Sequence, residues 1–357
     1  MDHFIARRDL VESENFSKLI LRSKTLESLV SAKHPNKEKV LDLLDYPSYF
    51  DLLKLPLPAS RDRIIKSLSD DRLIQASAAG GWDITYLGAI LFAKRLADFP
   101  RLGRKAVRVV QYRGKDRMSP IKEQIINQGY AVGFEELLNC VTWILPGKEV
   151  IRQALRHEVR MYPELAIREL IANALIHQDF LITGAGPMVE VFLNRIEITN
   201  PGAPLVSTDR FVDTPPRSRN EAMASMMRRF GICEERGSGI DKVMLEVESF
   251  RLPAPLFETP GDFTRSILFA PESLKDMGRR DRIRACYLHA CLCYVTHRKM
   301  SNATLRNRFG IAEQNSADAS RLLKEAVEDG KIVIEDPTAG TRNRTYLPFW
   351  AGSSAEE

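Results

Sequence analysis

The chain has 357 residues, of which 44% are hydrophobic and 28% charged, and its formal net charge at pH 7 is +5. This length predicts two or three domains, and the modest charge permits an anionic partner without indicating one. The sequence has no run of about 18 apolar residues, no apolar signal core at its start and an odd number of cysteines, which excludes a membrane span, a secretion signal and a disulfide framework. We therefore expect a cytoplasmic protein.

Residues 1–159 mix helical and strand patterns, which predicts an α+β region. Residues 60–94 predict a helix, a strand, a Gly-Gly turn, a strand and a helix. That order fits either a small winged-helix element near residues 55–95 or a simple α+β packing unit. Residues 104–115 are rich in β-branched side chains and predict a largely buried strand. Seven Arg or Lys against one Asp between Arg101 and Arg117 indicate either solvated strand ends or an anion-binding surface.

Residues 160–272 predict a helix, two strands, two helices and a final strand, the order of an α/β layer with helices packed on a sheet. The opening helix is expected to carry Pro163 in its first turn, where a missing N–H costs nothing. The two strands alternate around Asn194 and Arg195. The two later helices flank a glycine-rich turn.

Residues 280–351 predict a compact helical unit with a terminal hairpin. The expected order is a helix over residues 279–295, a second helix capped by Ser301 and stopped by Gly310, a third helix and two strands. That is the order of a winged helix-turn-helix domain.

The helical stretch Arg168–Phe180 is largely apolar, yet Glu169, Asn173 and His177 recur at i, i+4 and i+8 and so share one stripe. A buried carboxylate or amide without a partner costs several kcal/mol, so this stripe must face water or a ligand cavity. An ordinary solvent-exposed helix edge and a binding site are both consistent with the pattern.

Two glycine-containing segments favour the binding site. The first strand pair ends in Asn200-Pro201-Gly202, a tight turn at which a planar ligand can approach the backbone. Gly237 and Gly239 open a helix, and the exposed N–H groups of a helix N-terminus favour phosphate. Taken singly, the first segment is an ordinary turn signal and the second is a common linker sequence.

Together and in this order, the three segments resemble the nucleotide site of the GHKL ATPases. The E-x-x-x-N of Glu169 and Asn173 resembles the N-box, and the two glycine segments stand at the first and second glycine boxes. Residues 160–272 look more closely like a bacterial family of ATP-binding transcriptional regulators, some of them described as RecG-helicase-like. The resemblance implies a GHKL-type α/β sandwich, preceded by the mixed α+β region and followed by the winged helix.

The resemblance also implies roles for individual residues, with ATP and Mg²⁺ as cofactors. Glu169 would be the catalytic base that activates water at the γ-phosphate. Asn173 would supply an oxygen to Mg²⁺. Asn200 would face adenine, and Gly202 would allow the base to approach closely. An aspartate is usual where this sequence has Asn200, so the acceptor here is a neutral amide.

The remaining cofactor-binding residues belong to the phosphate end of the implied site. Gly237, Ser238 and Gly239 would offer backbone N–H groups to the phosphates. His177 and Asp179, at the end of the N-box helix, would lie near the phosphates or near the lid, which is the segment between the two glycine boxes.

The sequence lacks the motifs that helicase and sensor-kinase activities require. The sequence has no G-x-x-x-x-G-K-[ST], which excludes helicase activity. A sensor-kinase-like phosphotransferase would need a dimerisation helix with an acceptor histidine, and none precedes the ATP domain. Members of the resembled family often begin with a Schlafen-AlbA-type nucleic-acid-binding domain, for which the sequence before residue 40 is too short.

A helix with two cysteines and two histidines has the composition of a zinc site. The four residues are Cys286, His289, Cys293 and His297. On one straight helix they would span about 16 Å, so they cannot surround one tetrahedral ion. We expect core cysteines and a partly exposed histidine.

DNA binding by the C-terminal unit rests on charge. Eight Arg or Lys against one acid lie between Arg279 and Arg308, whereas residues 309–336 hold three bases and seven acids. An acidic recognition helix suits a major groove only if its acids face away. The residues expected to contact DNA are Gln314, Asn315 and Arg321 on that helix, with Arg342 and Arg344 on the wing. The alternative is a winged helix that docks on protein.

The sequence therefore predicts an ATP-binding, slowly ATP-hydrolysing regulator that couples nucleotide state to DNA binding through a winged helix. Its partners would be ATP and DNA, with a homodimer as a further option. The alternative is an ATP-sensing protein-interaction module that neither hydrolyses ATP nor binds DNA. A purely structural interpretation makes the polar stripe a solvated face and the Gly-Ser-Gly segment a linker.

Overall fold

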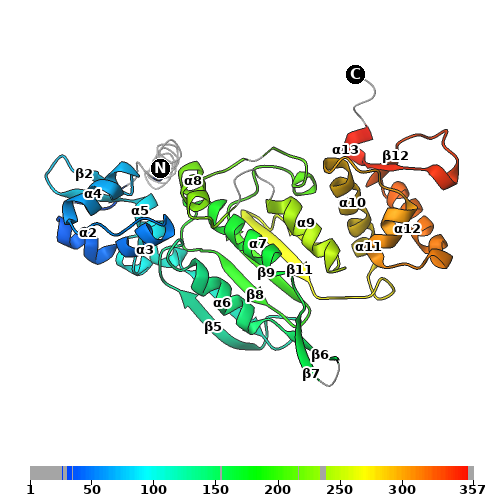
Figure 1. The fold of residues 1–357 in the computed structure, drawn as a ribbon, viewed down its shortest axis with the longest axis horizontal. Helices are drawn as coiled ribbons and strands as arrows, with labels where there is room; N and C mark the ends of the chain where they lie inside the picture. Colours follow the sequence, from blue (N-terminus) through cyan, green and yellow to red (C-terminus); the bar gives the residue numbers. More distant parts are fainter. Residues whose placement is uncertain are drawn as a thin grey trace, which may run out of the picture.

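The computed structural model describes residue 26 and residues 30–33, 35–152, 155–215, 217–233 and 239–352. Along the long axis of the molecule, an N-terminal unit, a central sheet with its helices and a C-terminal unit follow one another (Figure 1). Helices and strands alternate through the central part, which makes the protein α/β, as the sequence predicts. Within the described residues, no helix has the length and apolarity needed to cross a membrane.

The N-terminal unit combines short helices with a small antiparallel sheet of order β1-β3-β2. Its elements are β1 (Val30–Ala32), α2 (Lys37–Leu43), α3 (Tyr46–Leu52), α4 (Arg61–Asp70), β2 (Ile74–Ala76), β3 (Trp82–Thr85), α5 (Tyr86–Phe92), η1 (Leu96–Asp98) and η2 (Gly103–Lys105). The helix, strand, turn, strand and helix predicted for residues 60–94 are α4, β2, β3 and α5 with their connecting turn. Thr85 ends β3 and also caps α5, because its hydroxyl accepts a hydrogen bond from Gly88 N at 3.0 Å.

The central unit is built on a six-stranded sheet of order β10-β11-β9-β8-β4-β5. Its elements are β4 (Val107–Tyr112), β5 (Pro120–Ile126), α6 (Phe134–Ile144), β6 (Gly147–Arg152), β7 (Leu155–Arg160), α7 (Glu164–Ile176), β8 (Met188–Val191), β9 (Arg195–Pro201), η3 (Thr208–Arg210), α8 (Glu221–Arg229), α9 (Gly239–Ser249), β10 (Leu256–Glu258) and β11 (Phe263–Phe269). β4 runs parallel to β8, and all other pairs are antiparallel. Two strands of this sheet come from before residue 160, so the sheet spans the boundary that the sequence pattern suggested.

Helices α6, α7 and α9 cover one face of the six-stranded sheet (Figure 1). Side chains alternate along β9, so Ile196 and Ile198 enter the core beneath these helices and Asn200 lies on the same face. α7 begins at Glu164, and Pro163 is its N-cap rather than a residue of its first turn. The helix ends at Ile176, so the residues after His177 form a loop and not a further helical turn.

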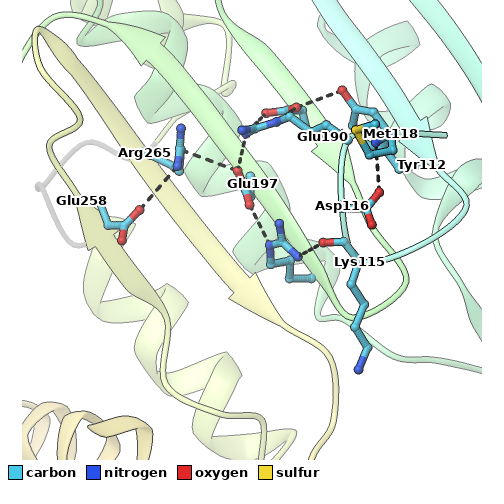
Figure 2. Close-up of polar contacts among 10 residues, drawn as sticks. Tyr112, Lys115, Asp116, Met118, Glu190, Glu197, Glu258 and Arg265 are labelled. Atoms are coloured by element: carbon cyan, nitrogen blue, oxygen red, sulfur yellow. Dashed lines mark hydrogen bonds and ion pairs between the residues drawn. The ribbon is translucent and has the colours of Figure 1, made fainter. Parts of the chain in front are cut away.

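The opposite face of the sheet carries a buried charge network (Figure 2). Glu190 on β8 and Glu197 on β9 are 1% and 4% exposed. Arg117, from the loop between β4 and β5, donates to Glu190 at 2.6 and 2.8 Å and to Glu197 at 2.8 Å. Arg195 and Arg265 also contact Glu197, at 2.7 and 3.6 Å. Each buried carboxylate therefore has a cation, without which its burial would be strongly unfavourable.

The basic segment Arg101–Arg117 is in part the expected set of solvated residues, since Arg101, Arg104, Arg113 and Lys115 are exposed, but its other three cations have contacts within the fold. Arg117 neutralises buried glutamates, and Arg108 pairs with Glu123 at 2.9 Å. Lys105 is 2% exposed and donates to the carbonyl of Ile182 at 2.7 Å. Burial lowers the pKa of Lys105 to about 8.

The C-terminal unit has the elements that the sequence predicts. They are α10 (Arg279–Val295), α11 (Asn302–Phe309), η4 (Glu313–Asn315), α12 (Ser316–Glu328), β12 (Ile332–Ile334), η5 (Thr341–Asn343), β13 (Tyr346–Pro348) and α13 (Phe349–Gly352). Ser301 and Thr304 form a capping box at the start of α11, and Gly310 ends that helix in the left-handed conformation. β12 and β13 pair as the expected antiparallel hairpin.

The C-terminal unit packs on α9 through a buried ionic cluster. Glu248, near the end of α9, lies 3.0 Å from His289 Nδ1 and 3.3 Å from Arg308 Nε. Arg308 also donates to the carbonyl of Leu252 at 2.6 Å. α9 thus packs against α7 of the central unit and contacts α10 of the C-terminal unit (Figure 1).

Candidate nucleotide site

A cavity of about 390 Å³ opens between α7, the sheet, α8 and the start of α9. This volume lies within the range of small-molecule sites, roughly 300–1,000 Å³. The cavity is lined by Glu169, Leu170, Asn173, Ala174, Ile176, His177, Asn200, Ala203, Pro204, Leu205, Val206, Phe211, Thr214, Pro215, Arg217, Ser218, Arg219, Glu221, Ala224, Arg228, Cys233, Gly239, Ile240, Thr264 and Ser266. Its lining combines apolar walls with a few charged and amide side chains.

The polar stripe of α7 faces this cavity. Glu169, Asn173 and His177 all line it, although Glu169 is only 3% exposed. Most of the apolar residues of α7 are buried, and Leu165 in its first turn is the exposed exception. Burial, reinforced by the nearby Arg219 guanidinium, lowers the pKa of His177 below its ordinary value. The helix therefore presents a carboxylate, an amide and a neutral imidazole to one cavity.

One end of the cavity is formed by the turn after β9. Asn200 Nδ2 donates to the carbonyl of Pro201 at 3.2 Å, so its Oδ1 is left to accept from a ligand. Gly202 has φ +113°, a conformation that side chains with a Cβ rarely adopt. The Thr264 hydroxyl fixes this turn by donating to the carbonyl of Gly202 at 2.7 Å. Gly202 itself does not line the cavity, whereas the next residue, Ala203, does.

Thr264 and Ser266 were not among the residues predicted from the sequence, although both line the cavity from β11. They alternate with Arg265, which belongs to the charge network on the other face. Thr264 pairs with Asn200 across β11 and β9, so the two side chains share a face. The alternation of side chains along β11 indicates that Thr264 and Ser266 share a face. Only the pairing of β11 with β9 shows that this face is the one that carries Asn200.

Asp179 lies beside the cavity and is not part of its lining. Its N–H donates to the carbonyl of Pro201 at 2.7 Å, and its carboxylate lies 3.3 Å from Arg219 Nη1. Arg219 also donates to the carbonyl of Ala203 at 2.6 Å. Asp179 thus positions Arg219, which does line the cavity, and holds the loop after α7 against the turn after β9.

The other end of the cavity is formed by Glu169 and the start of α9. A Cβ placed on Gly239 would lie 2.9 Å from Glu169 Oε2 and 3.7 Å from Asn173 Nδ2. Gly239 is the first residue of α9, so the helix N-terminus meets the polar stripe of α7 directly. The predicted phosphate-binding residues Gly237 and Ser238 lie outside the described residues.

The oxygen-bearing side chains of the cavity suit a magnesium ion that is coordinated mainly by a bound ligand and by water. In the described ranges, no group of three or more His, Cys, Asp or Glu side chains is placed to hold a metal ion. Mg²⁺ commonly takes one or two protein oxygens and completes its shell with water and substrate phosphates. Asn173 offers such an oxygen in the cavity, next to the carboxylate of Glu169. These residues therefore fit a magnesium ion that arrives with a nucleotide.

The helix with zinc-like composition has other contacts. His289 lies 3.0 Å from the Glu248 carboxylate and 3.6 Å from Cys293 Sγ. Cys286 is buried, and His297 is exposed at the end of α10. The geometry agrees with a structural role for these residues.

The residues predicted to contact DNA occupy two separate places. Gln314 and Asn315 are exposed in η4, directly before α12. Arg321 on α12 is paired with Asp318 of the same helix. Arg342 is exposed in the hairpin loop, and Arg344 donates to the carbonyl of Ala339 at 3.3 Å.

A comparison with known protein families matches the part of the chain that forms most of the cavity. Residues 184–268 match the family described as "Putative ATP-dependent DNA helicase recG C-terminal". The chain contains an ATPase-like domain. The match runs from the loop before β8 into β11 and includes α8 and α9. It leaves out α7, whose polar stripe completes the cavity.

The crystal structure of the DIP2311 protein from Corynebacterium diphtheriae has a similar fold. The TM-score is 0.55 at 15% sequence identity, over 91% of this chain and 64% of that one. This chain therefore spans less than two thirds of that structure, and the likeness concerns the fold alone. No curated protein matches the chain.

Proposed function

We propose that this protein binds ATP with Mg²⁺ in the cavity between α7, α8 and α9 and hydrolyses it slowly. The observation that carries the proposal is the convergence of Glu169, Asn173, Asn200 and Gly239 on one cavity. These residues come from a helix, a strand and a helix N-terminus that are well separated in the sequence. The ATPase-like match of residues 184–268 supports the same assignment.

Adenine recognition is assigned to the end of the cavity at the turn after β9. Asn200 is 4% exposed, and its amide presents an acceptor oxygen because its N–H₂ group is engaged by Pro201. That oxygen accepts from the 6-amino group of adenine, whereas guanine would present an acceptor of its own. Thr264 and Ser266 supply hydroxyls on the same face. The site is expected to prefer ATP over GTP.

Hydrolysis is assigned to the Glu169 end. Glu169 is buried at this end of the cavity, and its carboxylate can take a proton from a water aligned with the terminal phosphate. Asn173, one turn later, offers its side-chain oxygen to magnesium, which when bound offsets the phosphate charge. Gly239 permits this arrangement because a side chain there would meet the Glu169 carboxylate. His177 lies at the far end of the stripe and hydrogen-bonds to the ligand as a neutral imidazole.

The fold is proposed to be a GHKL-type sandwich within residues 160–272, completed by β4 and β5 from the region before it. A winged helix-turn-helix of residues 280–351 follows, and we propose that its hairpin contacts DNA, which would make the protein a regulator of transcription. Arg298, in the loop after α10, and Arg342, in the hairpin loop, are exposed and support this.

A second candidate for the C-terminal unit is docking on protein. The basic side chains around α12 are engaged by its own acids, since Arg321 pairs with Asp318 and Arg279 lies 3.3 Å from Asp329. A helix whose charges are already balanced gains little from phosphate contacts. This observation favours a protein partner for α12 and leaves the hairpin as the DNA-contacting part.

The proposal is tested by measuring affinity and turnover together. The wild-type protein is expected to bind ATP more tightly than GTP and to release phosphate slowly. Glu169→Gln is expected to bind ATP and to lose turnover by roughly 100-fold. Unchanged turnover in this variant would indicate a module that senses ATP without hydrolysis. Equal binding of ATP and GTP would contradict the role of Asn200.

Binding to duplex DNA separates the two candidates for the C-terminal unit. The double variant Arg342→Ala, Arg344→Ala is expected to weaken binding and to lower its salt dependence, and Arg321→Ala is expected to have little effect. The absence of DNA binding by the wild-type chain would favour protein docking.

A further inference from the structure

Arg228 stands out among the cavity-lining cations because it is half-buried and its side chain has no hydrogen-bond or ion-pair partner among the described residues. Three arginines line the cavity: Arg217, Arg219 and Arg228. Arg219 is paired with Asp179, whereas the side chains of the other two make no hydrogen bond or ion pair with any described residue. Arg228 is also half-buried, and a half-buried cation is unfavourable unless something neutralises it.

The two ends of α8 lie at opposite ends of the cavity. Asn220, just before the helix, donates to the carbonyls of Ile176 and Gln178, at 2.7 and 2.8 Å. This places the start of α8 beside the end of α7. The chain just after α8 lies beside the start of α7, because Arg168 donates to the carbonyl of Gly231. α8 therefore runs antiparallel to α7 along the cavity.

This direction assigns each arginine to one end. Arg219 precedes α8 and contacts the turn after β9, which is the end assigned to adenine. Arg228 is the penultimate residue of α8, so it lies toward Glu169 and Gly239, the end assigned to the phosphates.

The position of Arg228 is fixed from outside the cavity. Its neighbour Arg229 lies 2.8 Å from Asp71 of the N-terminal unit, and Tyr49 donates to the same carboxylate at 2.7 Å. The ring of Phe230 packs edge-on against Phe92, with centroids 5.5 Å apart. α8 is thus held between the N-terminal unit and α7 (Figure 1). A cation on so constrained a backbone is preorganised for an anion.

We propose that Arg228 binds the terminal phosphate of the nucleotide and makes the site prefer a triphosphate to a diphosphate. This inference rests on the proposed ATP-binding function and names the residue that distinguishes ATP from ADP. An arginine is suited to the task because its planar group can donate two hydrogen bonds to one phosphate. ADP, which lacks that phosphate, leaves Arg228 without its partner.

The test compares the affinities of a non-hydrolysable ATP analogue and of ADP, both with Mg²⁺, by calorimetry. The wild-type protein is expected to prefer the triphosphate, and Arg228→Ala to reduce that preference by roughly tenfold or more, mainly through loss of triphosphate affinity. Arg228→Lys keeps the charge but loses the paired donors. Its preference for the triphosphate is expected to lie between those of the wild-type protein and Arg228→Ala.

Arg217→Ala is the matched control, because Arg217 lines the same cavity, has no hydrogen-bond or ion-pair partner among the residues that the structure describes, and precedes α8. It is expected to preserve the preference. If it reduces the preference as much as Arg228→Ala does, a general positive field and not a contact is responsible, and the inference is overturned. A wild-type protein without preference, or an Arg228→Ala variant that retains it, also overturns the inference. A wild-type protein that binds neither nucleotide instead overturns the ATP-binding function itself. Unchanged thermal unfolding of each variant establishes that the fold is intact.

Discussion

Gly239, the first residue of α9, lies directly against the carboxylate of Glu169. A Cβ at Gly239 would be 2.9 Å from Glu169 Oε2, closer than two such atoms can normally approach. The obstructing atom is the end of a side chain, so the carboxylate can move while the backbone stays in place. A glycine is thus required here by the position of the proposed catalytic base.

Gly239→Ala is therefore expected to affect chemistry more than folding. The added methyl group displaces the Glu169 carboxylate, and a misplaced base loses roughly tenfold or more in rate. ATP affinity is expected to change much less. Turnover and the dissociation constant of ATP, measured on the same preparation, check this. Normal turnover in this variant would show that the Glu169 position is not critical.

Gly202→Ala is expected to weaken both ATP binding and stability. At φ +113° an alanine is strained, at a cost of about 1–3 kcal/mol. Its Cβ would also lie 2.9 Å from the backbone nitrogen of Asp179, so the turn that carries Asn200 must shift. Gly330→Ala is the control, since Gly330 has φ +68° with open space around it. Urea unfolding and ATP calorimetry should show loss of affinity in the first variant alone.

The charge network on the far side of the sheet predicts a contrast between two arginines. Arg117→Ala leaves the buried Glu190 and Glu197 without their main cation and is expected to lower the free energy of unfolding by about 3–5 kcal/mol. Arg108→Ala removes a pair whose side chains are 52% and 44% exposed, and should cost about 1 kcal/mol or less. Similar losses in urea unfolding of the two variants would argue against this account of the network.

His289 predicts a pH dependence of stability. Burial alone would lower its pKa, but contacts with Cys293 and the Glu248 carboxylate raise the pKa from 6.5 to about 9. A raised pKa means that the folded state holds the proton more tightly than the unfolded state. The resulting stability is fully present below pH 6.5 and is lost as the pH rises through about 9.

The expected loss across that window is on the order of 1–3 kcal/mol. Urea unfolding between these pH values measures it, with Glu248→Gln as the reference. The substitution removes the carboxylate and should flatten the pH dependence. An equally steep decline in both proteins would assign the effect to another group.

The elements of the C-terminal unit could be predicted from the sequence because its helix boundaries are locally encoded. Ser301 caps α11 and Gly310 ends it, and both signals are read within a few residues. The polar stripe of α7 was equally visible, since three polar side chains recur on one face of an apolar helix. Its orientation toward a cavity required the whole fold.

Features that depend on distant contacts could not be predicted. Glu190 and Glu197 alternate with apolar residues, a pattern that normally indicates a solvated strand face. They are buried because Arg117 reaches them from more than 70 residues earlier in the chain. Lys105 likewise lies in a basic segment but is buried against a loop that no local pattern connects to it.

The central claim is a magnesium-dependent nucleotide site in which Asn173 takes part, and calorimetric titration of Mg-ATP into the wild-type and Asn173→Ala proteins tests it most directly. The wild-type protein is predicted to bind ATP more tightly with Mg²⁺ than without it. Asn173→Ala is predicted to remove most of that difference, with affinity falling by roughly tenfold or more. Absence of binding to the wild-type protein at millimolar Mg-ATP would contradict the nucleotide site.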